Sequence, residues 1–165
     1  MIVYSFNNQI RFNSKGEFNL PVGKRDFNDK MRKKLIDFVQ RIQSGHYEFI
    51  SRDFREINLD GYTEKSFFYI DPPYLITCAG YNENDGWTEQ DEKDLLEFMD
   101  KLNGRGIRFA LSNVLTSNGR NNELLKNWLE RRDYRVINLD YSYANSNYHK
   151  RRIDSKVQEI LAVNY

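Results

Sequence analysis

Residues 67–74 read Phe-Phe-Tyr-Ile-Asp-Pro-Pro-Tyr, and this octapeptide constrains the chain more than any other segment. Its first four residues are apolar or aromatic, as in a short buried strand. Because Pro72 and Pro73 cannot donate ladder hydrogen bonds and hold the chain extended, we expect the strand to end there in a stiff turn. The turn would present the acid Asp71, free backbone carbonyls and the Tyr74 ring at the carboxyl end of a strand. Open α/β sheets bind their ligands at that edge.

Composition narrows the class of protein. The chain has 165 residues, which suffices for one domain with a real core. Its net charge of +1 gives no global basic field that would indicate nucleic acid. Cys78 is the only cysteine, and His46 and His149 are far apart, so we expect no internal disulfide and no metal site. The chain has neither an apolar run of membrane-spanning length nor a secretory signal pattern, which predicts a soluble cytoplasmic protein.

Strand and helix patterns alternate from the Pro-Pro turn onward. This alternation favours a largely parallel α/β sheet. The last two strands leave no room for a crossover helix, so they are expected to form an antiparallel pair. We expect helices over 27–44, 88–104 and 121–132, strands over 67–70, 107–112, 135–140 and 157–163, a further short strand over 46–50, and a strand and turn within 2–12.

The turn resembles the Asp-Pro-Pro-Tyr motif of DNA adenine-N6 methyltransferases. The exocyclic amine of adenine is a poor nucleophile, because its lone pair is delocalised into the ring. Asp71 and the backbone carbonyl of Pro72 offer two acceptors for the amino hydrogens, and Tyr74 offers a flat face for a flipped base. The resemblance implies that Asp71, Pro72, Pro73 and Tyr74 are catalytic and that Asp71 also contacts the cofactor, S-adenosyl-L-methionine. The alternative is a strand-ending turn, with Asp71 as a cap and Tyr74 in the core.

A second segment extends the resemblance. Residues 11–13 (Arg-Phe-Asn) and 16–23 (Gly-Glu-Phe-Asn-Leu-Pro-Val-Gly) resemble the target-recognition segment of Dam-like adenine methyltransferases, typically aromatic-Asn and then Gly-Glu-Phe-Asn-Val-Pro-Phe-Gly. The chain is therefore similar to the carboxyl-terminal portion of a Dam-like, alpha-group enzyme. This implies an α/β fold with a partial Rossmann-like class I methyltransferase sheet and antiparallel carboxyl-terminal strands. Residues 1–60 would form the target-recognition region with a small hairpin and helix, and residues 61–165 the catalytic half-domain.

The same resemblance implies double-stranded DNA as the partner and a GATC-like target. Phe6 matches an aromatic residue that wedges into the base stack, and Asn7 matches the polar residue beside it. Arg11 matches the arginine that reads O6 and N7 of a guanine. Pro21 matches an apolar contact to a thymine methyl group. The implied DNA-binding residues are Phe6, Asn7, Arg11, Asn13, Asn19, Pro21, Lys24 and Arg25.

Each of these contacts has a plainer alternative. Phe6 can be core in a small hairpin, and Arg11 can be a surface salt-bridge partner. Asn13 and Asn19 are equally suited to forming turns. The basic cluster within 24–34 either grips phosphates or is an ordinary solvated helix face.

The chain departs from the family in what precedes the recognition segment. Members begin with a Gly-rich Phe-x-Gly-x-Gly turn and an acidic residue that bind S-adenosylmethionine, and this chain contains neither. We therefore expect a truncated portion that binds the cofactor weakly by itself. The strand over 67–70 normally has a neighbour on each side, so a free edge predicts self-association or pairing with a complementary amino-terminal methyltransferase fragment.

Together the motifs indicate a site-specific DNA adenine-N6 methyltransferase that flips adenine, such as one from a restriction–modification system, a phage or a host. One alternative is a non-catalytic DNA-binding remnant, and another is one subunit of a split enzyme. A third keeps the chemistry on RNA or a protein glutamine amide, and the recognition segment over 11–23 argues against it.

Overall fold

The computed structural model describes residues 12–13, 15–19, 21–24, 26–77, 86–139 and 157–165. The chain divides into two compact units, Met1–Ser51 and Arg52–Tyr165. The functional division expected at residue 60 stays a prediction. Most of the strand and turn expected within 2–12 lies outside the described residues.

The first unit contains a turn closed by two phenylalanines. Phe12 and Phe18 form an isolated antiparallel bridge, and their rings meet edge-on with 6.1 Å between centroids. Between them the Asn13 Oδ1 accepts hydrogen bonds from the backbone N–H groups of Lys15 and Glu17. Gly16 has a φ of 75°, a left-handed conformation that glycine adopts without steric cost. The side chain of Asn13 is thus engaged in forming this turn.

Helix α1, Asp29–Ser44, begins after Asn28, whose side chain accepts a hydrogen bond from the N–H of Met31. The helix lies within the predicted range of 27–44, but none of its residues is buried. The strand predicted over 46–50 is wrong: these residues form no strand, and no described strand pairs with them. Phe49 is 76% exposed there, so the apolar run lacks the partner that a strand requires.

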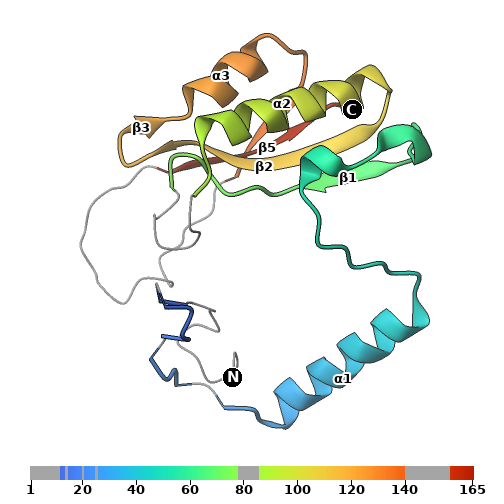
Figure 1. Cartoon of the computed structure of the whole chain (residues 1–165), viewed down its shortest axis with the longest axis vertical. Coiled ribbons are helices and arrows are strands. Elements are labelled where there is room, and N and C mark those ends of the chain that lie inside the picture. Colours follow the sequence, from blue (N-terminus) through green and yellow to red (C-terminus); the bar gives the residue numbers. More distant parts are fainter. Residues whose placement is uncertain (1–11, 14, 20, 25, 78–85, 140–156) are drawn as a thin grey trace. The chain divides into compact units, whose positions relative to one another are not determined.

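The second unit is built on one mixed sheet with helices on one face (Figure 1). The strand order is β1-β2-β5-β4, with β3 paired to β2. β1 runs parallel to β2, and β5 is antiparallel to β4, as predicted for the last two strands. β5 is also antiparallel to β2, so among the described strands the sheet is mixed rather than largely parallel. The strands are β1 Phe67–Ile70, β2 Arg108–Ser117, β3 Arg120–Asn121, β4 Arg135–Leu139 and β5 Gln158–Val163.

Helices α2, Glu89–Gly104, and α3, Glu123–Glu130, lie on the same face of this sheet (Figure 1). Both were expected from the sequence. Their apolar sides bury a continuous core against β2 and β5, with Met99, Leu102, Phe109, Leu125 and Ile160 fully buried. Burial of this apolar area is the main term that stabilises the unit.

Several features were not expected from the sequence, among them the two-residue strand β3. Two short 3-10 helices, η3 Phe54–Glu56 and η4 Leu59–Gly61, precede β1, and Leu59 joins the core. β2 runs to Ser117 rather than stopping at 112. The reason is that β2 pairs with β1 near its start and with β5 as far as Thr116, so its ladder continues beyond the apolar run.

Both ends of α2 are capped. At its start Thr88 and Asp91 form a capping box, in which each side chain accepts a hydrogen bond from the other residue's backbone N–H. At its end the N–H of Ile107 donates to the carbonyl of Leu102, and Gly106 turns the chain with a φ of 68°. The helix therefore has a defined start and a defined end.

Replacing Leu102 by alanine should destabilise the second unit by about 2–5 kcal/mol, because it leaves a cavity at a fully buried position. Urea unfolding of the full chain measures the loss. Lys101→Ala, one residue earlier on the exposed side of α2, is the matched control and should change stability little. Equal losses in both variants would show that this part of α2 does not pack as described.

Asp91 makes a stability contribution that depends on pH. Hydrogen bonds from Thr88, with a further one from Arg55, lower the pKa of Asp91 from 3.8 to about 2. A lowered folded-state pKa gives stability that is present above 3.8 and is lost as the pH falls from 3.8 toward 2. Asp91→Asn should cost about 1 kcal/mol at neutral pH, the usual effect of losing a helix cap.

Urea unfolding at a series of pH values from about 5 down to about 2 measures this dependence, because that range includes both the ordinary and the lowered pKa of Asp91. Stability should fall less steeply in Asp91→Asn than in the unmodified chain. Asp133→Asn, at an exposed aspartate with no ion pair among the described residues, serves as the control. A slope in Asp91→Asn as steep as that of the unmodified chain would contradict this assignment.

Candidate active site

The Asp-Pro-Pro-Tyr turn stands at the carboxyl end of β1. The parallel register pairs Ile70 with Leu111, so the turn begins beside Ser112 of β2. The Tyr74 hydroxyl donates to Oδ1 of Asp71 at 3.2 Å and lies 3.3 Å from the Oγ of the buried Ser112. The four residues predicted to be catalytic therefore form one structured turn, tied to the neighbouring strand through its tyrosine.

The environment of Tyr74 keeps its hydroxyl protonated. Burial raises the pKa of Tyr74, and the negative charge of Asp71 and the hydrogen bond to it act in the same direction. The hydrogen bond with Ser112 acts in the opposite direction and does not cancel them. At neutral pH the phenol is therefore a hydrogen-bond donor, which holds the Asp71 carboxylate in place.

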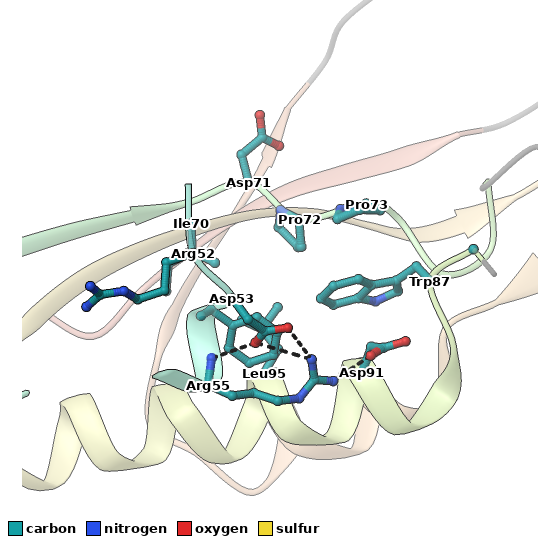
Figure 2. A pocket seen from close by; sticks show the side chains of 12 residues that line it. Arg52, Asp53, Arg55, Ile70, Asp71, Pro72, Pro73, Trp87, Asp91 and Leu95 are labelled. Atoms are coloured by element: carbon teal, nitrogen blue, oxygen red, sulfur yellow. Dashed lines mark hydrogen bonds and ion pairs between the residues drawn. The ribbon is translucent and has the colours of Figure 1, made fainter. Parts of the chain in front are cut away.

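A pocket of about 460 Å³ opens beside this turn (Figure 2). Its wall comes from three parts of the second unit: the segment before and within η3, the end of β1 with its turn, and the start of α2. The lining residues are Arg52, Asp53, Phe54, Arg55, Ile70, Asp71, Pro72, Pro73, Gly86, Trp87, Asp91 and Leu95.

Two aromatic side chains meet in this wall. Phe54 and Trp87 lie with their ring centroids 6.0 Å apart. Figure 2 shows the Trp87 ring pointing into the space between the two prolines on one side and Arg55 with Asp91 on the other. The Asp71 carboxylate points in this view to the side opposite Asp53 and Asp91. The pocket thus has an aromatic wall and carries the Asp71–Tyr74 turn on its rim.

Arg55 joins the segment before β1 to the start of α2. Its guanidinium lies 3.0 Å from Asp53, 2.5 Å from Asp91 and 2.7 Å from Asp94, and 4.6 Å from the centre of the Phe54 ring. Hydrogen bonds to Asp94 and Asp91 raise the pKa of Arg55, and the bond from Arg55 lowers the pKa of Asp94. These charges are partly exposed, so the ion pairs contribute little to the stability of the fold. Their main effect is to hold Asp53 and Asp91 in place beside the pocket.

The sequence analysis predicted the turn residues of this site but not the rest of its wall. Asp53 and Phe54 lie far from the turn in sequence, and no role was predicted for Trp87. The available signals were Trp87 standing directly before the N-cap Thr88 and an arginine among carboxylates, neither of which specifies a pocket by itself. Pairing of η3 with α2 brings these residues together.

The predicted DNA-binding residues belong to the first unit. Phe6, Asn7, Arg11 and Arg25 lie outside the described residues. Asn19, Pro21 and Lys24 are exposed, and Asn13 is engaged in its turn. Their roles toward DNA stay predictions. Within the described residues there is no cluster of three His, Cys, Asp or Glu side chains arranged for a metal ion, and no helix is long and apolar enough to cross a membrane.

Comparison with known proteins gives related methyltransferases. Over 98% of this chain, 42% of residues are identical to the modification methylase StsI of Streptococcus sanguinis, and 38% are identical over the whole chain to the type II methyltransferase M.FokI of Planomicrobium okeanokoites. The DNA adenine methylase of Escherichia coli K12 is 25% identical over 97% of the chain. The chain spans 25% and 26% of the first two proteins and 54% of the third.

The sequence profile of the D12 class N6 adenine-specific DNA methyltransferases matches residues 2–145, which include the turn, the pocket wall, α2 and β2. The resemblance first seen in the Asp-Pro-Pro-Tyr turn and the recognition segment is therefore confirmed at the level of the family. This chain belongs to the D12 class of N6 adenine-specific DNA methyltransferases.

Proposed function

We propose that this chain carries the catalytic turn of a DNA adenine-N6 methyltransferase, which transfers a methyl group from S-adenosyl-L-methionine to N6 of an adenine flipped out of duplex DNA. The observation that carries the proposal is the turn Asp71–Tyr74 at the carboxyl end of β1, with its tyrosine bonded to its aspartate and a pocket beside it. Membership of the D12 class supports the same reaction.

The turn's own atoms suit an adenine amine. The carboxylate of Asp71 and the carbonyl of Pro72 can each accept one amino hydrogen, which leaves the nitrogen lone pair free to be aimed at a methyl donor. Neither proline offers a competing N–H. Among the described residues, no hydrogen bond occupies the Pro72 carbonyl. Tyr74, held by Asp71 and Ser112, offers its ring face for stacking on the flipped base.

The pocket fits the cofactor in its chemistry. Its volume of about 460 Å³ lies in the range of small-molecule sites, and Phe54 and Trp87 offer aromatic surface for a planar base. The Asp53 carboxylate can accept hydrogen bonds from amino or hydroxyl groups. When bound, S-adenosylmethionine supplies a methyl group on a positively charged sulfonium. The carboxylates around the pocket favour that charge.

The target is proposed from the recognition segment. Arg11, Pro21 and their neighbours match the positions through which Dam-like enzymes contact GATC, so we propose a GATC-like site read from the major groove. Phe6 and Asn7 would stand beside the flipped adenine, while Lys24 and Arg25 would contact the backbone or a base edge. Contacts from Asn13 and Asn19 belong to the same proposal.

Asp71→Ala should reduce methyl transfer by about 100-fold or more, because the amine loses a preorganised acceptor. The assay measures labelled methyl groups transferred from S-adenosylmethionine to a GATC duplex. Asp133→Ala, an exposed change away from the turn, should leave transfer unchanged, and a duplex in which the GATC adenine is replaced should accept none. Equal transfer by Asp71→Ala would contradict the proposed role. No transfer by the unmodified chain would favour a DNA-binding remnant or a subunit of a split enzyme.

A partner strand is a further part of the proposal. Among the described strands β1 is paired on one side only, and its Phe67 and Tyr69 side chains are 52% and 62% exposed. An unpaired edge with apolar side chains favours pairing with another strand. We propose that this strand comes from a second copy of the chain or from a complementary methyltransferase segment.

Sedimentation velocity over a range of protein concentrations tests this edge. The unmodified chain should associate as its concentration rises, and Tyr69→Lys should reduce that association, because a charged side chain discourages pairing at an edge. Asn127→Lys, which adds the same charge at an exposed position on α3 rather than on a strand, is the control. A monodisperse unmodified chain that also fails to bind the amino-terminal segment of a relative would refute the partner strand.

A further inference from the structure

A carboxylate without a cation lies buried behind the pocket. Glu92, in the first turn of α2, has no exposed surface. Its Oε2 accepts a hydrogen bond from Trp87 Nε1 at 2.7 Å, and its Oε1 accepts from Asn122 Nδ2 at 2.8 Å and from Asn113 Nδ2 at 3.4 Å. In the part of the chain that the structure describes, no lysine or arginine pairs with Glu92.

Such a group is costly to bury. An ionised carboxylate loses several kcal/mol of hydration in a protein interior unless hydrogen bonds replace the water. Here three N–H donors do so, and they come from three different places: the loop before α2, the middle of β2 and the N-cap of α3. Asn113 and Asn122 are themselves 0% and 1% exposed. Glu92 is therefore the common acceptor of a closed network.

Trp87 is the member of this network that lines the pocket. The Asn side chains are enclosed in the unit, whereas the Trp87 ring points into the pocket (Figure 2). Its centroid lies 6.0 Å from that of the Phe54 ring. The indole N–H is held by its bond to Glu92, and the ring lies tilted against Phe54. Without that bond the ring could turn about its side-chain torsions, since it precedes the helix rather than belonging to it.

We propose that Glu92 is a positioning residue for the pocket: by accepting the Trp87 indole N–H it holds that ring as the flat wall on which the planar base of the methyl donor rests. The assignment of the donor rests on the function proposed above, whereas the assignment of Glu92 to Trp87 rests on the hydrogen bonds alone. Glu92 touches neither the donor nor the reacting amine, and acts through Trp87.

The substitution Glu92→Gln isolates this role. A glutamine keeps the size of the side chain but replaces one acceptor oxygen by an NH₂ donor. If its oxygen stays on the two asparagine amides, its NH₂ faces the indole N–H, and two donors cannot bond to each other. The Trp87 indole N–H then loses its acceptor, whereas the hydrogen bonds from Asn113 and Asn122 persist.

Tryptophan fluorescence of the full chain measures how accessible the Trp87 ring is to a quencher. Trp87 and Trp128 are the chain's two tryptophans, so Trp128→Phe leaves Trp87 as the single reporter. In that background Glu92→Gln should raise the acrylamide quenching constant of Trp87 about two-fold or more, as a buried N–H loses its acceptor. The control in the same background is Asp100→Asn, a carboxylate-to-amide change elsewhere in the unit at the acceptor of Arg132, and it should leave Trp87 unchanged.

Cofactor binding supplies the second readout. By calorimetric titration with S-adenosylmethionine, Glu92→Gln should weaken binding about ten-fold, the effect of leaving one buried donor unsatisfied. Trp87→Phe removes the indole N–H but keeps an aromatic ring. In the Trp87→Phe background the further change Glu92→Gln should have little effect on binding, because the residue through which Glu92 acts is gone. A general loss of folding would lower binding in both backgrounds.

The outcomes separate the two proposals. Unchanged quenching of Trp87 in Glu92→Gln, or an equal loss of binding in both backgrounds, overturns the positioning role. Failure of the unmodified chain to bind S-adenosylmethionine counts against the proposed function, and the quenching result still decides the role of Glu92. If Glu92→Gln does not fold, hydrogen exchange of the Trp87 indole N–H in the unmodified chain decides: slow exchange supports the bond to Glu92, and exchange as fast as in free tryptophan overturns it.

Discussion

The structure depends on β2 being paired on both sides at once. Parallel pairing with β1 and antiparallel pairing with β5 make it the central strand, and its Phe109 and Leu111 are fully buried under α2 and α3. This register therefore places the carboxyl end of β1 beside Ser112. The Pro-Pro turn begins there, and Tyr74 reaches back to both Asp71 and Ser112. The position of the Asp71–Tyr74 turn thus follows from one strand pairing.

Two polar networks of different kinds shape the pocket beside this turn. The Arg55 network is partly exposed and links η3 to α2 through three carboxylates, so solvent screens it and its charges are worth little to stability. The Glu92 network is buried and contains no cation among the described residues, so each of its hydrogen bonds matters more. The first orients the acidic rim of the pocket, and the second holds one aromatic wall.

Sequence reasoning was most successful where local chemistry decides the outcome. The strand over 67–70 and the helix over 88–104 were predicted from pattern and are present. It failed over 46–50, where an apolar run was read as a strand, because a strand exists only where another strand pairs with it. It also ended the strand predicted from residue 107 at residue 112, whereas β2 runs to Ser117. The pairing with β5 continues past the apolar run from which the strand was predicted.

The sequence by itself determined the family and predicted the turn proposed to be catalytic, because both depend on short runs of residues whose types and order carry the chemistry: an acid, two prolines and a tyrosine after a strand, and a recognition segment before it. Only the tertiary structure decided the pocket. Phe54 lies far from Trp87 in sequence, and Glu92, although it follows Trp87 by only five residues, takes its other hydrogen bonds from Asn113 and Asn122, 21 and 30 residues further on. Packing of η3 and α2 against the sheet brings them together.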